Sequence, residues 1–147
     1  MAEVTNTPQP FQPGFRLIDG SQLNALLTQQ LYTTDSGIVA STVQTRAGAK
    51  QLTQAISQIA TANASDAVKL PGSGANVNGV PSPNVMLIAN DSGQTIQIFP
   101  AGANDVIDGG AAGAAVNMGT GKRGIFMVIS DVGGLRTWVS VATTKST

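Results

Sequence analysis

The sequence predicts a mainly β fold: a jelly-roll-like β-sandwich of about eight strands, preceded by one amphipathic N-terminal helix and an extended arm. Short β-branched or apolar segments recur at roughly 8–12-residue spacing, separated by Gly, Asn, Asp and Pro. Two segments, residues 85–89 and 125–129, are apolar throughout, which is typical of strands buried on both faces. Two such strands imply a core between two sheets.

The 147 residues are expected to form one folded domain. We divide the chain into an extended arm over residues 1–15, an amphipathic helix segment over 16–36 and the β-sandwich over 37–147. Charged residues make up only 11% of the chain and the formal net charge is +0. A polar but nearly uncharged surface gives little repulsion between copies, so it permits self-association or docking on a larger body.

The N-terminal residues predict an arm that docks on a neighbouring molecule. Pro8, Pro10 and Pro13 hold the chain extended and remove backbone donors. Phe11 and Phe15 are two of only four phenylalanines, whereas disordered tails are normally poor in aromatic residues. A frayed terminus is the alternative.

Residues 19–32 carry the clearest helix pattern. Leu23, Leu26, Leu27 and Leu31 follow a spacing of i, i+3, i+4 and i+8, which places them on one face. Asp19 or Ser21 caps the start, and the turn residues at 33–37 stop the helix. The leucine face is expected to pack in the core or against another subunit.

The middle of the chain reads as strands and one long loop. Strands are expected at residues 38–45 and 67–70. Residues 52–61 match a helical face well and strand alternation poorly, but the segment is short and lies within an otherwise β chain. A helix and a strand that begins at Ile56 with a bulge therefore both remain open on the pattern alone. Residues 72–83 are rich in Gly, Pro and Asn and form a loop, either a binding loop or a tolerated insertion.

Residues 84–109 organise the chain. The apolar run at 85–89 is followed by the turn residues 90–93 and then by the alternating segment 95–98, which ends at Pro100. This order predicts a β-hairpin. Further strands are expected at 114–118, 125–129 and 135–142.

The last strand predicts a homo-oligomer. Leu135, Val139 and Val141 alternate with Trp138 and so face the opposite side. We expect the Trp138 ring to be exposed, and a large exposed apolar ring requires cover by the leucine helix or by a sister subunit.

The composition argues against catalysis and against a bound cofactor or metal. The chain has no His and no Cys, which removes the commonest general base and the thiolate ligands. Asp105 and Asp108 offer carboxylates for Ca²⁺, but turn formation is the simpler reading. Scattered basic residues argue against nucleic-acid binding. No apolar run approaches the ~20 residues that cross a bilayer, and residues 1–10 do not resemble a signal peptide.

Four stretches resemble virion structural proteins of tailed bacteriophages. FRLIDGSQLNAL (15–26) resembles a segment that precedes their small β-domains, and LTQAISQIATA through DAVKLP (52–71) resembles the lead into their first sandwich strands. VMLIANDSGQTIQIFPAGANDVIDG (85–109), and GKRGIFMVIS (121–130) with the strand that carries Trp138, resemble later strand pairs. Asp108 replaces a frequent asparagine, and the 72–83 insert is longer than usual. The resemblance favours a strand from Ile56.

The resemblance implies a head decoration, or cement, protein that binds the outside of the assembled capsid and bridges subunits of the major capsid protein. It would be made in the host cytoplasm and reside on the capsid surface, most simply as a trimer. The alternative is an adhesion or carbohydrate-binding module on a fibre or tail, for which Trp138 and Tyr32 are the candidate aromatics. The expected contact residues with partners are Pro8, Pro10, Phe11, Phe15, Leu23, Leu27, Leu31 and Trp138.

Overall fold

The computed structural model describes residues 34–73, 76–77, 80–81 and 83–144. The predicted arm at 1–15 and the predicted helix at 19–32 lie outside the described residues. Those that are described form strands, turns and loops and no helix, so the mainly β prediction is confirmed. The strands are β1 (Thr34–Val39), β2 (Lys50–Gln51), β3 (Ile56–Thr61), β4 (Ala67–Lys69), β5 (Asn76–Val77), β6 (Val80–Pro81), β7 (Val85–Asn90), β8 (Ile96–Phe99), β9 (Val106–Ile107), β10 (Val116–Met118), β11 (Lys122–Val132) and β12 (Leu135–Thr144).

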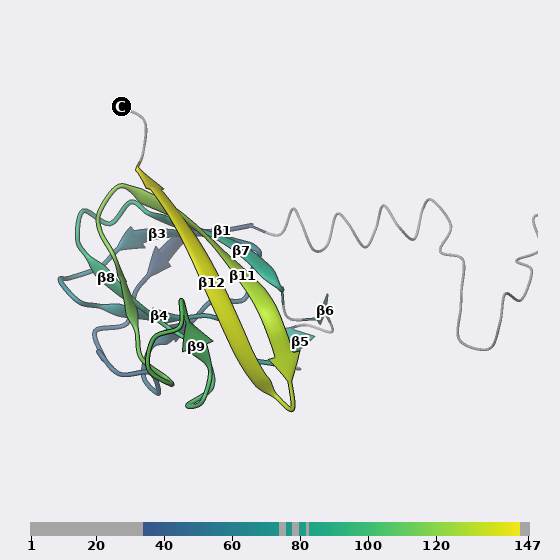
Figure 1. Ribbon diagram of the computed structural model, residues 1–147. Coiled ribbons are helices and arrows are strands. Elements are labelled where there is room, and N and C mark those ends of the chain that lie inside the picture. Colours follow the sequence, from purple (N-terminus) through teal and green to yellow (C-terminus); the bar gives the residue numbers. More distant parts are fainter. Residues whose placement is uncertain (1–33, 74–75, 78–79, 82, 145–147) are drawn as a thin grey trace, which may run out of the picture.

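The strands build two main sheets (Figure 1). The larger has six strands in the order β1-β3-β7-β11-β12-β9, and the smaller has four in the order β10-β8-β4-β2. β5 and β6 form a separate two-stranded ribbon. β7, β11 and β12 pair antiparallel, whereas β1, β3 and β7 run parallel to one another, as do β2, β4 and β8. The larger sheet therefore combines one local hairpin, β11–β12, with long crossover connections, whereas no two neighbouring strands of the smaller sheet are consecutive in the chain.

The hydrophobic core lies between the two sheets. The six-stranded sheet contributes buried side chains such as Met86, Phe126 and Trp138, and the four-stranded sheet contributes Val68 and Ile98. These side chains project from the inner face of each sheet, as the period of two in a strand requires. The prediction of a two-layer core is thus confirmed.

The predicted hairpin at 84–109 is wrong, although both of its strands exist. β7 pairs with β3 and β11, whereas β8 pairs with β4 and β10 in the other sheet. The residues between them carry the chain from one sheet to the other. β3 and β11 occupy both edges of β7, and β4 and β10 occupy both edges of β8, so the two strands meet only through their buried apolar side chains in the core.

Residues 52–61 resolve as a strand from Ile56, which confirms the reading favoured by the resemblance. β3 pairs in parallel with β1, and irregularities in their register occur between Asp35 and Val39. The expected strand at 38–45 is displaced, because β1 spans Thr34–Val39 and includes part of the predicted helix stop. Gly37 lies within β1 at a φ of 76°, so a turn-type residue is used inside a strand.

Candidate interaction surface

The outer face of the six-stranded sheet is apolar at β7. Val85 and Leu87 point outward and are 50% and 37% exposed. Met86 and Ile88 alternate with them and are fully buried in the core. β7 is therefore an aliphatic strand of which one face is packed and the other is open.

The two neighbouring strands continue the same outer face. On β11, Ile125 and Met127 are 41% and 37% exposed, while Phe126 between them is buried. On β12, Val141 is 54% exposed and Val139 is half-buried. Three adjacent strands thus each present two aliphatic side chains outward.

The register brings these side chains together. Ile125 lies between Leu87 and Val141, and Met127 lies between Val85 and Val139. Directly opposed residues of paired strands have Cβ atoms about 4.5–5.5 Å apart, so each row of three is continuous. We call this surface the aliphatic face; its residues are Val85, Leu87, Ile125, Met127, Val139 and Val141. Apolar patches of this kind mark sites of association on soluble proteins.

The predicted orientation of the last strand is reversed. Trp138 is wholly buried, and the opposite set that contains Val141 is the exposed one. The alternation of β12 was predicted, but not which side faces the core. Arg136 is buried beside the tryptophan, with its guanidinium carbon 5.8 Å from the centre of the ring.

The expectation that residues 85–89 and 125–129 are buried on both faces is wrong. Both segments lie in the six-stranded sheet, and no described element covers the outer side of that sheet.

Apolar side chains also mark the end of the β11–β12 hairpin. Val132 and Leu135 pair across it and are 73% and 50% exposed. Ile129, at the irregularity in the register, is 63% exposed. Gly133 and Gly134 form the turn with positive φ, which fits a tight two-residue connection. The hairpin therefore extends the apolar surface beyond the aliphatic face.

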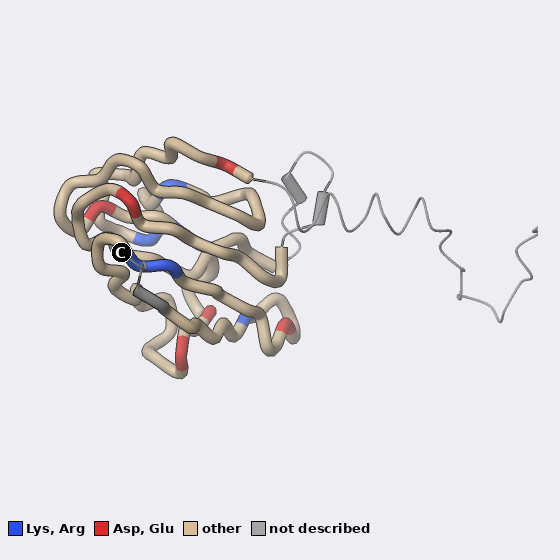
Figure 2. The backbone as a smooth tube through the Cα atoms, turned by 90° about the horizontal axis from the view of Figure 1, so that it is seen from above, with Lys and Arg blue, Asp and Glu red and all other residues tan. Residues whose placement is uncertain are grey.

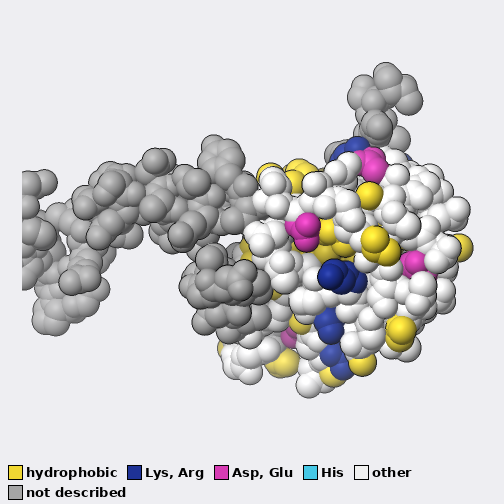
Figure 3. Space-filling view, turned by 180° about the vertical axis from the view of Figure 1, so that it is seen from behind, with side chains coloured by type: hydrophobic (Ala, Val, Ile, Leu, Met, Phe, Trp, Pro, Cys, Tyr) yellow, Lys and Arg dark blue, Asp and Glu magenta, His cyan; other side chains and the backbone are white. Residues whose placement is uncertain are grey.

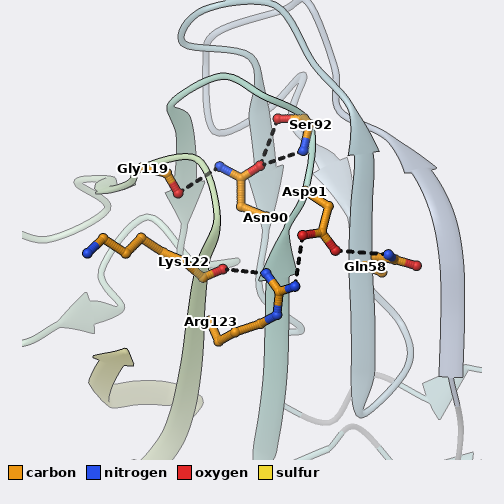
Figure 4. A network of polar contacts seen from close by, with 7 residues as sticks. All are labelled: Gln58, Asn90, Asp91, Ser92, Gly119, Lys122 and Arg123. Atoms are coloured by element: carbon orange, nitrogen blue, oxygen red, sulfur yellow. Dashed lines mark hydrogen bonds and ion pairs between the residues drawn. The ribbon is translucent and has the colours of Figure 1, made fainter. Parts of the chain in front are cut away.

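A polar cluster borders the aliphatic face at its other end (Figure 4). The Arg123 Nη2 atom lies 2.8 Å from Asp91 Oδ1, and Gln58 Nε2 donates to Asp91 Oδ2 at 2.9 Å. Arg123 Nη1 also donates to the carbonyl of Lys122 at 3.2 Å. These contacts join β3 and β11 through the residue after β7. Since Arg123 and Asp91 are only partly exposed, the cluster gives the apolar surface a fixed polar edge.

The buried amide of Asn90 holds the connection between the sheets (Figure 4). Its Nδ2 atom donates to the carbonyls of Gln94 at 2.7 Å, Met118 at 3.0 Å and Gly119 at 3.1 Å. Its Oδ1 atom accepts from the backbone N–H and the hydroxyl of Ser92. One side chain thus links β7, the crossing turn and the chain after β10. Sequence reasoning identified Asn90 as a turn residue, and its role is structural.

A second polar cluster fixes the ends of the 72–83 loop. The buried Arg136 donates from Nε to Asp131 at 2.9 Å and from Nη1 to the carbonyl of Pro71 at 3.4 Å. Its Nη2 atom donates to Asn84 at 3.4 Å. Ser73 donates to Asp131 at 2.7 Å, and this hydrogen bond, followed by the Arg136 contact, lowers the pKa of the Asp131 carboxyl below its usual 3.8. The loop is therefore tied at both ends to the β11–β12 hairpin.

The two candidate calcium ligands each accept hydrogen bonds from backbone N–H groups, mainly those of β12. Asp105 accepts from the N–H groups of Gly102 at 2.8 Å and Arg136 at 3.0 Å. Asp108, at a positive φ of 52°, accepts from the N–H and hydroxyl of Ser140. Within the described ranges, no group of three or more acidic, His or Cys side chains is arranged to hold a metal ion. The Asp105 carboxylate closes the turn at 102–105, and both carboxylates tie their loops to β12.

Charge is sparse and mixed over the domain. Acidic and basic residues are distributed around the fold without a run of one sign (Figure 2). The side of the molecule seen in Figure 3 is mostly uncharged polar surface, with few charged side chains and small groups of hydrophobic ones. In the part of the chain that the structure describes, no helix has the length and apolar character needed to span a membrane.

Of the predicted contact residues, only Trp138 lies within the described ranges, and the aliphatic face was not predicted. Trp138 is in the core, so it is not an interaction residue. The aliphatic face was missed because unbroken apolar runs look the same whether one or both sides of a strand are covered. The remaining candidates lie outside the described residues; they are Pro8, Pro10, Phe11, Phe15, Leu23, Leu27 and Leu31.

Comparisons with known proteins do not assign the chain to a family. No family model, curated protein or solved structure matches it. The aliphatic face and the sequence are therefore the basis on which its function is inferred.

Proposed function

We propose that this chain is a structural protein of a tailed-phage virion, a head decoration protein that binds the outside of the assembled capsid. It bridges neighbouring subunits of the major capsid protein and has no catalytic role. Binding to the assembled shell and not to free subunits stabilises the shell by mass action. The sequence resemblance over residues 15–142 supports the virion assignment.

The aliphatic face carries the proposal of an assembly role. Fully burying an aliphatic side chain stabilises by about 1.5–3 kcal/mol, so covering the exposed half of each of these side chains contributes on the order of 1 kcal/mol. A domain that leaves several such side chains open on three adjacent strands is built to associate. An oligomer, most simply a trimer, is the form in which we propose that it acts.

The sparse charge supports the same role. With eight basic and eight acidic residues in 147, the domain offers little electrostatic repulsion to a sister copy or a capsid surface. The polar cluster at Asp91 and Arg123 borders the apolar surface, as polar rims border protein interfaces. We also propose that the two sheets belong to a jelly-roll-like sandwich, supported by their packing around one core and departing from it in the parallel pairs.

The structure does not support Trp138 as the aromatic residue of a carbohydrate-binding site. Stacking on a sugar requires an exposed aromatic ring, and Trp138 is wholly buried. Tyr32, the other candidate, lies outside the described residues. Phe126 is also buried, and Phe99 is partly so. The described surface therefore offers aliphatic contact more readily than aromatic stacking.

The test is co-sedimentation of the purified full chain with expanded heads that lack it. We expect saturable binding and a higher temperature of head disruption in its presence. An Ile125→Ser variant should associate and bind less well, whereas an Asn117→Ala variant, changed at an exposed position of the four-stranded sheet, should bind like the parent. Absence of binding by a folded, oligomeric parent protein would refute the decoration role.

A further inference from the structure

We propose that the aliphatic face is occupied by residues 19–32 of a second copy of this chain, which docks its leucines there. This inference rests on the proposed function in one respect, since it supplies the contact by which a structural protein of this kind self-assembles. Beyond the proposed function, it names the docking segment (residues 19–32), the surface that receives it (the aliphatic face) and the exchange of this segment between two copies. The partner is thus a second copy of the same chain, and the two copies contact each other through aliphatic side chains.

The chemistry of the segment matches that of the face. Leu23, Leu26, Leu27 and Leu31 form one apolar stripe if residues 19–32 are helical, and no charged residue occurs from Gly20 to Thr34. The face likewise consists of aliphatic side chains without a charge among them. An amphipathic helix that lies in an apolar groove or on an apolar surface is a common mode of recognition.

The dimensions also match. A helix over residues 19–32 would be about 21 Å long at ~1.5 Å per residue. Three adjacent strands span about 10 Å from the first to the third at ~4.8 Å per spacing. The aligned residues Thr34, Ile56, Leu87, Ile125 and Val141 run across five strands, or about 19 Å. The segment is therefore long enough to cover the face in either direction.

The position of Thr34 favours a second copy over the segment's own sheet. Thr34 begins β1, an edge strand, and is already paired with Ile56. Only Thr33 separates it from the predicted helix, whereas connections between a helix and a strand that pack together usually need 2–6 residues. A hinge too short to fold back favours exchange of the segment between copies. The aliphatic face is centred on β11, three strands away from that hinge.

Cross-linking between two differently tagged copies tests the contact. The chain has no Cys, so each introduced thiol is unique. Leu27→Cys co-expressed with Leu87→Cys should give a disulfide-linked dimer that carries both tags. Leu27→Cys co-expressed with Asn117→Cys, on the other sheet, should give at most a tenth as much. Equal yields with the two partners would overturn the proposal. So would a double variant, Leu27→Cys with Leu87→Cys in the same chain, whose disulfide forms only within one chain and not between copies. Val85→Cys replaces Leu87→Cys if the latter alters the thermal melt.

Lengthening the hinge tests the exchange itself. Insertion of Gly-Ser-Gly-Ser between Thr33 and Thr34 should let the segment fold back on its own face and weaken self-association at least tenfold in sedimentation equilibrium. Unchanged self-association would overturn the exchange. Both experiments use purified protein without capsids, so their failure is distinct from a failure to bind heads.

Discussion

Replacing Asn90 by Ala is the most informative single change in the fold. The amide group of Asn90 is fully buried and its two N–H donors are shared among three backbone carbonyls, those of Gln94, Met118 and Gly119. Alanine removes both donors and leaves the carbonyls facing a small apolar methyl group. The backbone of residue 90 keeps its bond to Gly121, so the change isolates the side chain.

The expected loss follows from the number of donors removed. A buried polar group left without its partner costs about 1–3 kcal/mol, so two lost donors should lower the free energy of unfolding by about 3 kcal/mol. For a domain of this size, each kcal/mol shifts the melting temperature by about 2–4 °C, which gives a decrease of roughly 6–12 °C. The lost contacts to Ser92 add to this, since the N–H and hydroxyl of that residue donate to the side-chain Oδ1 of Asn90.

Urea unfolding followed by tryptophan fluorescence measures the effect, because Trp138 is the single tryptophan and is buried in the core. Ser92→Ala is the matched control. It removes the hydroxyl bonded to Asn90 but keeps all the amide donors, so it should cost about 1 kcal/mol or less. An Asn90→Ala variant no less stable than Ser92→Ala would show that the amide does not hold the two sheets together.

Three further predictions concern other parts of the chain. Gly113→Ala should cost about 2–4 kcal/mol because φ is +68° and a Cβ would lie 2.7 Å from a backbone carbonyl, whereas Gly121→Ala, at a φ of +69° in open space, should cost about 1 kcal/mol; equal losses in urea unfolding would contradict the clash. Asp131 has a lowered pKa in the folded state, so its stabilising effect is present above pH 3.8 and is lost as pH falls through the lower folded value. The difference in urea midpoint between the parent and Asp131→Asn should therefore shrink below that pH, and a difference that persists there would refute the assignment. Deletion of residues 1–13 should leave the melting temperature unchanged and weaken co-sedimentation with heads; a lower melting temperature would place the arm in the core.

The positions of most strands could be predicted from the sequence, but their partners could not. Apolar runs and turn residues located β7, β8, β11 and β12 to within a few residues. The turn residues after β7 are compatible both with a hairpin and with a crossing between sheets, since turn chemistry fixes the local backbone and not the partner. The pairing of β7 with β3 and β11 and the buried amide bonds of Asn90 to Met118 and Gly119 distinguish the two, and these are tertiary contacts.

The exposed side of β12 could not be predicted from the sequence either. Alternation along β12 separates two sets of residues but does not say which faces inward. Arg136 in one set favours an exposed side, yet it is buried because Asp131 on the facing strand, and Pro71 and Asn84 from distant segments, supply partners. Those partners cannot be inferred from the strand itself, so the open face was assigned to the wrong side.

The strand order of the larger sheet has a consequence for the rate of folding. β11 and β12 are joined by a two-residue turn and can pair as soon as both have been synthesised. β7 must wait for β11 on one side, and its other neighbour, β3, comes from much earlier in the chain. Pairings between distant segments slow folding, because the entropy of closing the loops is lost before the contacts form. We expect refolding on the millisecond-to-second scale, with the β11–β12 hairpin formed early and the edge strand β1 added last.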